Sequence, residues 1–343
     1  MRLLIITQKV DLNDSVLGFF HRWIVELSKK YESIVVICLY KGKNNLPSNV
    51  KLLSLGKEDG QSKLKYIFNF YKYIWSEKNN YDSIFVHMNQ EYILLAGIIW
   101  KVLKKNVYMW RNHHSGSLLT DIAAKFCTKV FCTSKFSYTA KYRNTEIMPV
   151  GVDLENFKPV ESIKRVDQSV LFLGRISPVK KPNLLIKIIP EIKKEFPNLE
   201  CIICGDPLPK DQKYMDQLVD MVKVADAQSY ISFNKGVRNT ETVDIYSKNN
   251  IFINLSSSGM YDKTIFEAIA CGCLIVASND NLIGQIDNDF IFKQDDTVEL
   301  SIKIKSLLKY TPDQRVAAVK RLQDFAKKHS LSELGNRLLV SIK

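Results

Sequence analysis

Short apolar runs alternate with longer amphipathic segments along the whole chain, and this alternation is the strongest constraint on its fold. The first β-rich runs, at 3–7 and 34–40, are almost continuously apolar. Between and after them, apolar residues recur at helical spacing, as at 17–29 and 64–75. Continuous apolar strands separated by helices indicate a parallel sheet that is covered on both faces. We therefore expect an α/β protein.

The same pattern assigns most of the remaining elements. Residues 156–169 form a polar interval with Pro159, which we interpret as a linker between two domains. Further strands are expected at 83–87, 107–110, 130–133, 170–173, 201–204, 231–233, 251–254 and 274–277. Further helices are expected at 92–103, 183–194, 214–224, 240–247, 263–270, 298–308 and 313–328, with a last one from residue 332.

The 343 residues are enough for two domains of roughly 100–200 residues each. We place a first doubly wound, Rossmann-like domain at 1–155 and a second at 156–328. Residues 329–343 are a candidate to pack back on the first domain as a helix. In such sheets ligands bind at the carboxyl ends of the strands, so two domains that face each other would enclose a central cleft.

The formal net charge of +13 implies attraction to a negatively charged partner. No run of five or six like charges marks a nucleic-acid-binding arm, so nucleic acid is not an expected partner. An anionic membrane surface and a merely solvated surface both remain open. The segment 64–75, together with Trp100, Lys101, Lys104 and Lys105, is basic and aromatic; it fits an anionic lipid surface and equally a core-packed helix with solvated lysines.

The cysteines and the apolar runs predict a cytoplasmic protein, with a peripheral position at the inner face of the membrane as a candidate. Seven cysteines, an odd number set mostly in strand-like runs, indicate reduced thiols. Cys201 and Cys204 form a C-x-x-C pair, but it lies in a run that reads as a buried strand. The run at 92–100 is about half as long as the ~20 residues that a membrane span needs. No signal peptide is expected at the start.

One candidate site follows the strand at 170–173. Gly174 and Arg175 come directly after it, and Lys180 precedes the next helix. Glycine lets a ligand approach the backbone, the arginine fork matches phosphate oxygens, and lysine adds a mobile charge. This arrangement suits a diphosphate, although a surface turn with two solvated cations explains it equally well.

A second candidate site follows the strand at 251–254. A small polar loop leads into the helix at 263–270, and helix N-termini bind anions. Glu267 is the carboxylate of that helix and stands between Phe266 and Ala268. Such a carboxylate either binds a partner, for which ribose hydroxyls would serve, or is an ordinary exposed helical residue.

These segments resemble glycosyltransferase family 4, the group 1 retaining nucleotide-sugar transferases with the GT-B fold. The resemblance covers nearly the whole chain and is strongest from Met148 to about Ser278. Five motifs follow one another in the family's order. They are Pro149-Val-Gly-Val-Asp153 through Pro159, Gly174-Arg175 with Lys180, Ile203-Cys-Gly205-Asp206, Phe233-Asn-Lys-Gly236, and Phe266-Glu-Ala-Ile-Ala-Cys-Gly272.

The resemblance implies a retaining glycosyltransferase that moves a sugar from a nucleoside-diphosphate donor to a glycan or lipid-linked acceptor, in cell-surface polysaccharide biosynthesis. Arg175 and Lys180 would stabilise the leaving diphosphate, and Glu267 would accept hydrogen bonds from the ribose. The loop from Gly259 to Thr264 would hold the sugar and the β-phosphate. The donor-binding residues so implied are Gly174, Gly205, Gly236, Val237, Gly259, Tyr261, Asp262, Lys263, Thr264 and Glu267.

One departure from the family pattern concerns the donor sugar. The family has two glutamates eight positions apart, but Gly259 stands eight positions before Glu267. Asp262 lies nearby at a different spacing. Either backbone groups and Asp262 make the sugar contact, or the sugar differs from the common hexoses. The donor base and the sugar therefore stay open.

In the first domain, the resemblance places a histidine near the donor sugar after a central strand. His113 and His114 both qualify, and we favour His114 because a loop opens after it. The family's acceptor loop corresponds to 9–21, where Asp14 and Gly18 are the candidate acceptor contacts. His21 is a weaker candidate, because a histidine on an apolar helix start more often packs in the core.

No cofactor and no metal are expected, with the nucleotide sugar as a substrate. Asp287 and Asp289 form a D-x-D pair, as in metal-binding sites, but Arg175 and Lys180 would already neutralise the charge of the diphosphate. A nucleotide-sugar epimerase of the same architecture and a basic nucleic-acid-binding protein are the alternatives. A dinucleotide-dependent oxidoreductase is disfavoured, because no G-x-G-x-x-G follows a strand.

Overall fold

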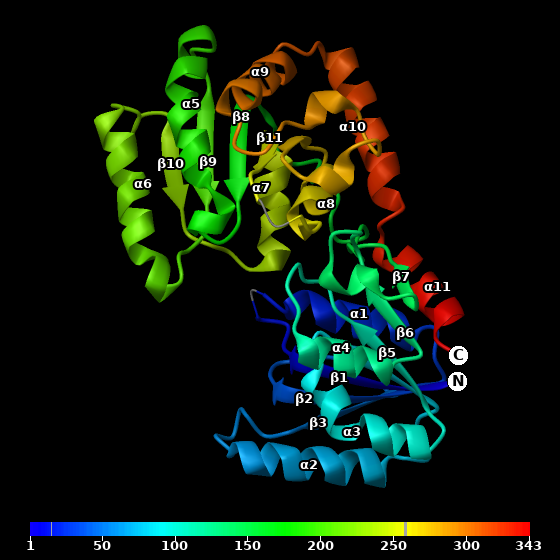
Figure 1. Ribbon diagram of the computed structural model, residues 1–343. Helices are drawn as coiled ribbons and strands as arrows, with labels where there is room; N and C mark the ends of the chain where they lie inside the picture. Colours follow the sequence, from blue (N-terminus) through cyan, green and yellow to red (C-terminus); the bar gives the residue numbers. More distant parts are fainter. Residues whose placement is uncertain (15, 257–258) are drawn as a thin grey trace. The chain divides into compact units, whose positions relative to one another are not determined.

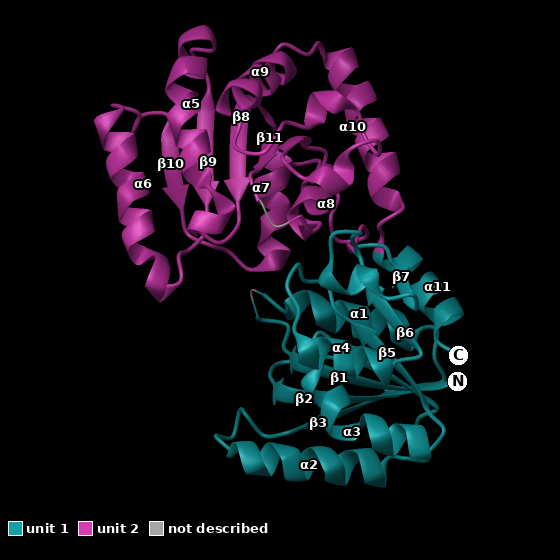
Figure 2. Ribbon diagram, viewed as in Figure 1, with its two compact units in different colours: residues 1–151, 331–343 teal, residues 152–330 magenta. Residues whose placement is uncertain are grey.

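The structure, a computed structural model, describes residues 1–14, 16–256 and 259–343. Ser15 in the expected acceptor loop, and Ser257 and Ser258 in the polar loop that precedes the expected donor residues, lie outside the described residues. The chain forms two compact units (Figure 2). Unit 1 comprises Met1–Gly151 and Leu331–Lys343, and unit 2 comprises Val152–Ser330.

Unit 1 is built on a parallel sheet with the strand order β3-β2-β1-β4-β5-β6-β7. The order reverses between β1 and β4, which makes that pair the topological switch point. The strands are β1 (Arg2–Val10), β2 (Ser33–Lys41), β3 (Val50–Ser54), β4 (Ser83–His87), β5 (Asn106–Trp110), β6 (Lys129–Cys132) and β7 (Thr145–Ile147).

Helices cover both faces of this sheet, because its central strands carry apolar side chains on both sides. One core joins α1 (Gly18–Ser28) and α11 (Leu331–Ser341) to the sheet. The opposite core joins α2 (Lys63–Ser76), α3 (Glu91–Val102) and α4 (Leu118–Lys125) to it (Figure 1).

The C-terminal helix belongs to unit 1. α11 packs against α1, and the carbonyl oxygen of Lys343 accepts hydrogen bonds from Ser83 Oγ at 2.7 Å and Asn106 Nδ2 at 3.0 Å. The sequence placed the domain limits at 155/156 and 328/329, whereas the units divide after Gly151 and after Ser330.

Unit 2 is a five-stranded parallel sheet with the order β10-β9-β8-β11-β12 and its switch point between β8 and β11. Helix α5 packs against α6 and α9, and α8 packs against α7 and α10. The strands are β8 (Val166–Leu173), β9 (Glu200–Cys204), β10 (Ile231–Asn234), β11 (Asn249–Asn254) and β12 (Leu274–Ala277). The helices are α5 (Pro182–Glu195), α6 (Gln212–Val224), α7 (Thr242–Lys248), α8 (Lys263–Ala270), α9 (Thr297–Leu308) and α10 (Pro312–Lys327).

The α/β class and two doubly wound sheets are as the sequence predicted, but the linker prediction is partly wrong. Its last residues form the start of β8, where Val166 pairs with Asn249 of β11. Two polar groups there bond to the neighbouring strand: Ser169 Oγ accepts from the Asn250 amide at 2.8 Å, and the Asp167 carbonyl accepts from Asn250 Nδ2 at 2.6 Å. Residues 166–169 of this polar interval therefore belong to a paired strand and not to a linker.

Candidate active site

The carboxyl ends of β8 and β9 present bare backbone. Gly174 and Gly205 follow these strands with φ of +155° and +153°, a region that side chains rarely occupy. A Cβ on Gly205 would stand 1.9 Å from the carbonyl oxygen of Gly174. Only glycine fits at Gly205, so the two strand ends meet without side chains between them.

Arg175 and Lys180 follow Gly174 in the chain, but only Lys180 is bonded to other side chains. Arg175 is exposed and has no hydrogen bond or ion pair with the described residues. Lys180 ends a single 3₁₀ turn, Pro178–Lys180, and its Nζ donates to Ser256 Oγ at 3.0 Å and pairs with Asp262. Ser256 and Asp262 both follow β11, so the side chain of Lys180 joins the ends of β8 and β11 at the switch point of the sheet.

Asp262 is held by three donors. Besides Lys180, its Oδ2 accepts from Asn254 Nδ2 and from Ser256 Oγ, each at 3.1 Å. Burial raises the pKa of this carboxyl, but the charge of Lys180 and the hydrogen bonds outweigh burial and lower the pKa to about 2. Asp262 is therefore a fixed anion that orients Lys180.

Helix α8 begins directly after Asp262. Thr264 lies in its first turn, and the Oγ1 of Thr264 is buried without a hydrogen-bond partner among the described residues. Burial lowers the pKa of Lys263, the first residue of the helix, while the charge of Glu267 raises it. A helix N-terminus with a lysine and an unsatisfied hydroxyl favours a bound anion.

Glu267 lies one turn further along α8 and is buried, so the interpretation as an exposed helical residue is wrong. Its Oε1 accepts from Asn239 Nδ2 at 3.1 Å and its Oε2 from the Tyr246 hydroxyl at 3.4 Å. Burial raises the pKa of Glu267. A carboxylate offers about four acceptor positions, so further hydroxyl donors can still bind.

Gly236 and Val237 follow β10 near Asn239. A Cβ on Gly236 would lie 2.7 Å from Oδ2 of Asp206, and Val237 is exposed. Arg238, next in the chain, donates to Glu241 Oε1 at 3.0 Å. The connection after β10 thus presents backbone and the apolar Val237 side chain, while Arg238 and Glu241 pair with each other.

Residues 259–261, before α8, are held by the segment that follows β12, a feature that the sequence analysis did not predict. Asn281 Nδ2 donates to the Gly259 carbonyl and Asn279 Nδ2 to the Met260 carbonyl, both at 2.6 Å. The Tyr261 hydroxyl donates to the Asn281 carbonyl at 2.9 Å, and burial raises its pKa to about 12. The Asn-rich segment after the strand at 274–277 was the available signal.

In unit 1, His113 and His114 follow β5 and are both exposed. Their rings stack with centroids 4.6 Å apart, and His113 Nδ1 accepts from the Ser115 amide at 3.0 Å. The sequence analysis missed His87, which ends β4 at the switch point of this sheet. His87 is buried, its Nδ1 lies 3.3 Å from Thr7 Oγ1, and its ring stacks on Phe20.

Asp14 and Gly18 are part of the entry into α1. Asp14 pairs with Lys9 at 2.7 Å, its Oδ1 accepts from the Leu17 amide at 2.6 Å, and Gly18 is the first residue of the helix. Their assignment as acceptor contacts stays a prediction. His21 is buried and its Nε2 accepts from the Asn45 amide at 3.2 Å, as expected for a packed histidine.

The D-x-D pair is engaged elsewhere. Asp287 pairs with Arg321 at 2.9 Å, and Asp289 accepts from the Tyr310 hydroxyl at 3.2 Å. Within 1–14, 16–256 and 259–343, no group of three or more His, Cys, Asp or Glu side chains is placed to hold a metal. All seven cysteines are free and buried, and Cys201 and Cys204 lie on β9 as predicted.

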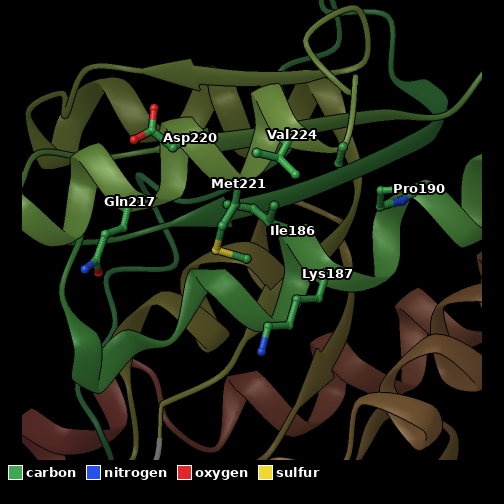
Figure 3. Close-up of a pocket in the computed structure, with 8 residues that line it drawn as sticks. Ile186, Lys187, Pro190, Gln217, Asp220, Met221 and Val224 are labelled. Carbon is green, nitrogen blue, oxygen red and sulfur yellow. The ribbon is translucent and has the colours of Figure 1, made fainter.

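A groove of about 530 Å³ lies between α5 and α6 (Figure 3). Its lining is mostly apolar and includes Ile186, Pro190, Met221 and Val224. None of the glycines, cations and carboxylates described above lines this groove. We therefore assign the site to the carboxyl ends of the strands, where those groups gather.

Comparison with known families matches the model "Glycosyl transferases group 1" to residues 153–328, more than half of the chain. The chain belongs to this family. The resemblance to this family noted in the sequence is confirmed. The match covers every unit 2 residue discussed above.

Two curated relatives each match less than half of this chain. A D-inositol 3-phosphate glycosyltransferase of Kineococcus radiotolerans is 27% identical over 154 residues, 41% of this chain and 35% of the relative. The alpha-monoglucosyldiacylglycerol synthase of Acholeplasma laidlawii is 28% identical over 177 residues, 46% of this chain and 43% of the relative. The matched segments thus span less than half of these relatives.

Solved structures show that the fold is GT-B. Anabaena HepE in complex with UDP aligns over 99% of both chains with a TM-score of 0.79 and 17% identity. WaaG, a glycosyltransferase involved in lipopolysaccharide biosynthesis, aligns over 99% of both chains with a TM-score of 0.68 and 12% identity. No helix in the described part of the chain is long and apolar enough to cross a membrane.

Proposed function

We propose that this glycosyltransferase uses a nucleoside-diphosphate sugar as donor and transfers the sugar to a glycan or lipid-linked acceptor. The observation that carries the proposal is the position of Lys180. It bridges β8 and β11 at the switch point, next to the bare backbone of Gly174 and the exposed Arg175. Two cations at the carboxyl edge of a parallel sheet suit a diphosphate.

The remaining groups fit the other parts of such a donor. Glu267 keeps acceptor positions for ribose hydroxyls, and the backbone after Gly236 leaves room for a base. The α8 N-terminus with Thr264 suits the β-phosphate and the sugar. UDP and UDP-glucose, the ligands named for the HepE structures, support this class of donor.

In the proposed reaction, the acceptor hydroxyl attacks the anomeric carbon on the face from which the nucleoside diphosphate departs. The bond from that carbon to the β-phosphate oxygen breaks, and the acceptor proton passes to the departing phosphate. Arg175 and Lys180 stabilise the charge that develops on the leaving group. Retention of configuration is taken from the family resemblance. His114, or His113, would face the donor sugar.

The reaction is proposed to need no metal, since Arg175 and Lys180 would neutralise the diphosphate and the D-x-D aspartates are bound to Arg321 and Tyr310. We propose assembly of a cell-surface glycan or glycolipid, in the cytoplasm, as the setting. The name of the Acholeplasma relative supports a lipid-linked acceptor, and seven free buried cysteines suit a reducing compartment.

A product assay tests the proposal. The protein is incubated with UDP-, GDP-, ADP- and CMP-sugars, with and without a mixture of lipid-linked and free glycan acceptors, and in the presence of a chelator. We expect one donor to be consumed with release of the nucleotide and formation of a glycosylated product. Turnover of the donor alone into an isomeric sugar nucleotide would contradict transfer and support an epimerase.

A further inference from the structure

The solvent-facing side of α2 is apolar and basic, although α2 also helps to close the core of unit 1. Only Phe70 and Ile74 of this helix are buried. Leu64, Phe68 and Trp75 recur along its outer side and are exposed, Phe68 to 61% and Trp75 to 58%. Soluble proteins rarely expose several large apolar side chains along one helix face, and such a patch is typical of a surface that binds a partner.

Helix α3 extends this surface. The Tyr71 hydroxyl donates to the Leu95 carbonyl at 2.9 Å, and Phe70 packs on Tyr92, so α2 and α3 lie side by side on one face of the sheet (Figure 1). Ile98 and Val102 of α3 are exposed at a spacing of four residues. We call Leu64, Phe68, Trp75, Leu95, Ile98 and Val102 the α2–α3 face.

Most of the charges around this face are positive, although Glu91 in the first turn of α3 is exposed. Helix α2 contains Lys63, Lys65 and Lys72 and no acidic residue. Lysines border the aromatic rings: Lys65 Nζ lies 5.1 Å from the Phe68 ring centroid and Lys78 Nζ lies 4.0 Å from that of Trp75. Glu77, at the end of α2, is buried and paired with Lys51 at 2.7 Å, so it does not offset these lysines.

We propose that the α2–α3 face docks unit 1 on an anionic lipid bilayer. Aromatic and aliphatic side chains would enter the boundary between headgroups and acyl chains, while the lysines beside them would contact anionic headgroups. Lysines with long stems next to aromatic rings suit this boundary, because the stem lies along apolar surface and the ammonium stays in water. The proposal stands independently of the donor site in unit 2.

Vesicle flotation of the full chain tests the proposal. One set of vesicles contains phosphatidylcholine alone, and in the other about one third of the lipid is phosphatidylglycerol. We expect flotation with the anionic vesicles, weakened by added salt, and much less with the neutral ones. Absence of binding to the anionic vesicles would overturn the proposal.

Trp75 provides a built-in probe of the bound state. The chain has four tryptophans, and Trp23, Trp100 and Trp110 are each no more than 3% exposed. A blue shift of the emission on adding anionic vesicles therefore reports Trp75 leaving water. We expect Trp75→Phe to abolish the shift while flotation persists. A shift of the same size in this variant would contradict insertion at Trp75.

A matched pair of variants separates this face from apolar surface in general. Phe68→Ser combined with Trp75→Ser should weaken vesicle binding roughly tenfold or more, because two large apolar groups no longer leave water. Val298→Ser combined with Ile302→Ser changes two exposed residues on α9 and should leave binding unchanged. Thermal unfolding checks that both variants fold.

Two outcomes would reject the lipid bilayer as the partner. Equal vesicle binding by the two double variants would show that the α2–α3 face is not involved. Concentration-dependent self-association that the Phe68/Trp75 double variant abolishes, without vesicle binding by the wild type, would identify the face as an interface between copies of the chain.

Discussion

The ammonium group of Lys180 forms an ion pair with the carboxylate of Asp262, which follows a different strand of the unit 2 sheet. Lys180 comes after β8 and Asp262 after β11, so the pair joins the two strands at the switch point. Asn254 and Ser256 complete the coordination of Asp262, which fixes both the anion and the cation. The cation is thereby held in place before any donor binds.

Asp262→Asn should lower kcat/KM for transfer about tenfold to a hundredfold, because Lys180 loses the anion that orients it. Asp295→Asn is the matched control. Asp295 pairs with the neighbouring Lys181 at 2.6 Å but is exposed, so its loss should change the rate less than about twofold. Equal effects of the two substitutions would show that Lys180 needs no positioning by Asp262.

The same carboxylate should contribute to stability in a defined range of pH. Its pKa is lowered to about 2 in the folded chain, so the stabilisation is complete above the unfolded pKa of about 4 and is lost as the pH falls toward 2. The contribution is about 2 kcal/mol in the free energy of unfolding. The free energy of unfolding, measured in urea, should fall more steeply between pH 5 and pH 2 for the wild type than for Asp262→Asn. Parallel declines would contradict the lowered pKa.

Glu267→Gln should weaken donor binding about tenfold to a hundredfold, because a hydrogen bond to a charged group contributes about 1.5–3 kcal/mol. The ribose assignment makes a sharper prediction for nucleoside diphosphates. The wild type should bind a 2′-deoxy analogue more weakly than the ribonucleotide, and Glu267→Gln should reduce this difference. Glu241→Gln, at an exposed carboxylate that pairs with Arg238, should retain the wild-type difference. Calorimetric titration measures the Kd of the ribonucleotide and of the 2′-deoxy analogue for each protein. An unchanged difference between the two nucleotides in Glu267→Gln would exclude the ribose contact.

Gly205→Ala should lower the free energy of unfolding of unit 2 by about 3 kcal/mol, because its Cβ would meet the Gly174 carbonyl oxygen at 1.9 Å and the two strand ends must separate. Gly284→Ala is the control for backbone strain alone. Gly284 has φ of +75° with no atom within 4 Å of an added Cβ, so about 1 kcal/mol is expected. Denaturant unfolding measures the loss of free energy of unfolding in each variant. Similar losses in both would contradict the close approach of the Gly205 backbone to the Gly174 carbonyl.

Most of the fold could be predicted from hydrophobic pattern, because buried parallel strands are continuous apolar runs. The bounds of β4 and α8 agree with the structure residue for residue. Strand β3 was missed because it is short and only partly buried, and α4 was missed because eight residues give little periodicity. The start of β8 does not follow the predicted linker because its polar residues pair with β11, which lies about 80 positions further along the chain.

The candidate site could be predicted as a set of residues but not as a network. Glycines and cations after strands indicate a phosphate site by their positions alone. The pairing of Lys180 with Asp262 joins residues 82 positions apart, and Asn281 reaches Gly259 across 22 positions. Such contacts depend on which strands are neighbours, and local sequence patterns do not contain that information.

The central claim is that Arg175 and Lys180 bind the diphosphate of a sugar nucleotide, and a thermal-shift panel tests it most directly. UDP-, GDP-, ADP- and CMP-sugars are added to the wild type, to Arg175→Ala and to Arg143→Ala, which removes an exposed arginine of unit 1. A donor at about 100 times its Kd adds about 2.7 kcal/mol of stability. One nucleotide class should stabilise the wild type and Arg143→Ala but not Arg175→Ala. Stabilisation of none of them, or equal stabilisation of Arg175→Ala, would contradict the diphosphate site.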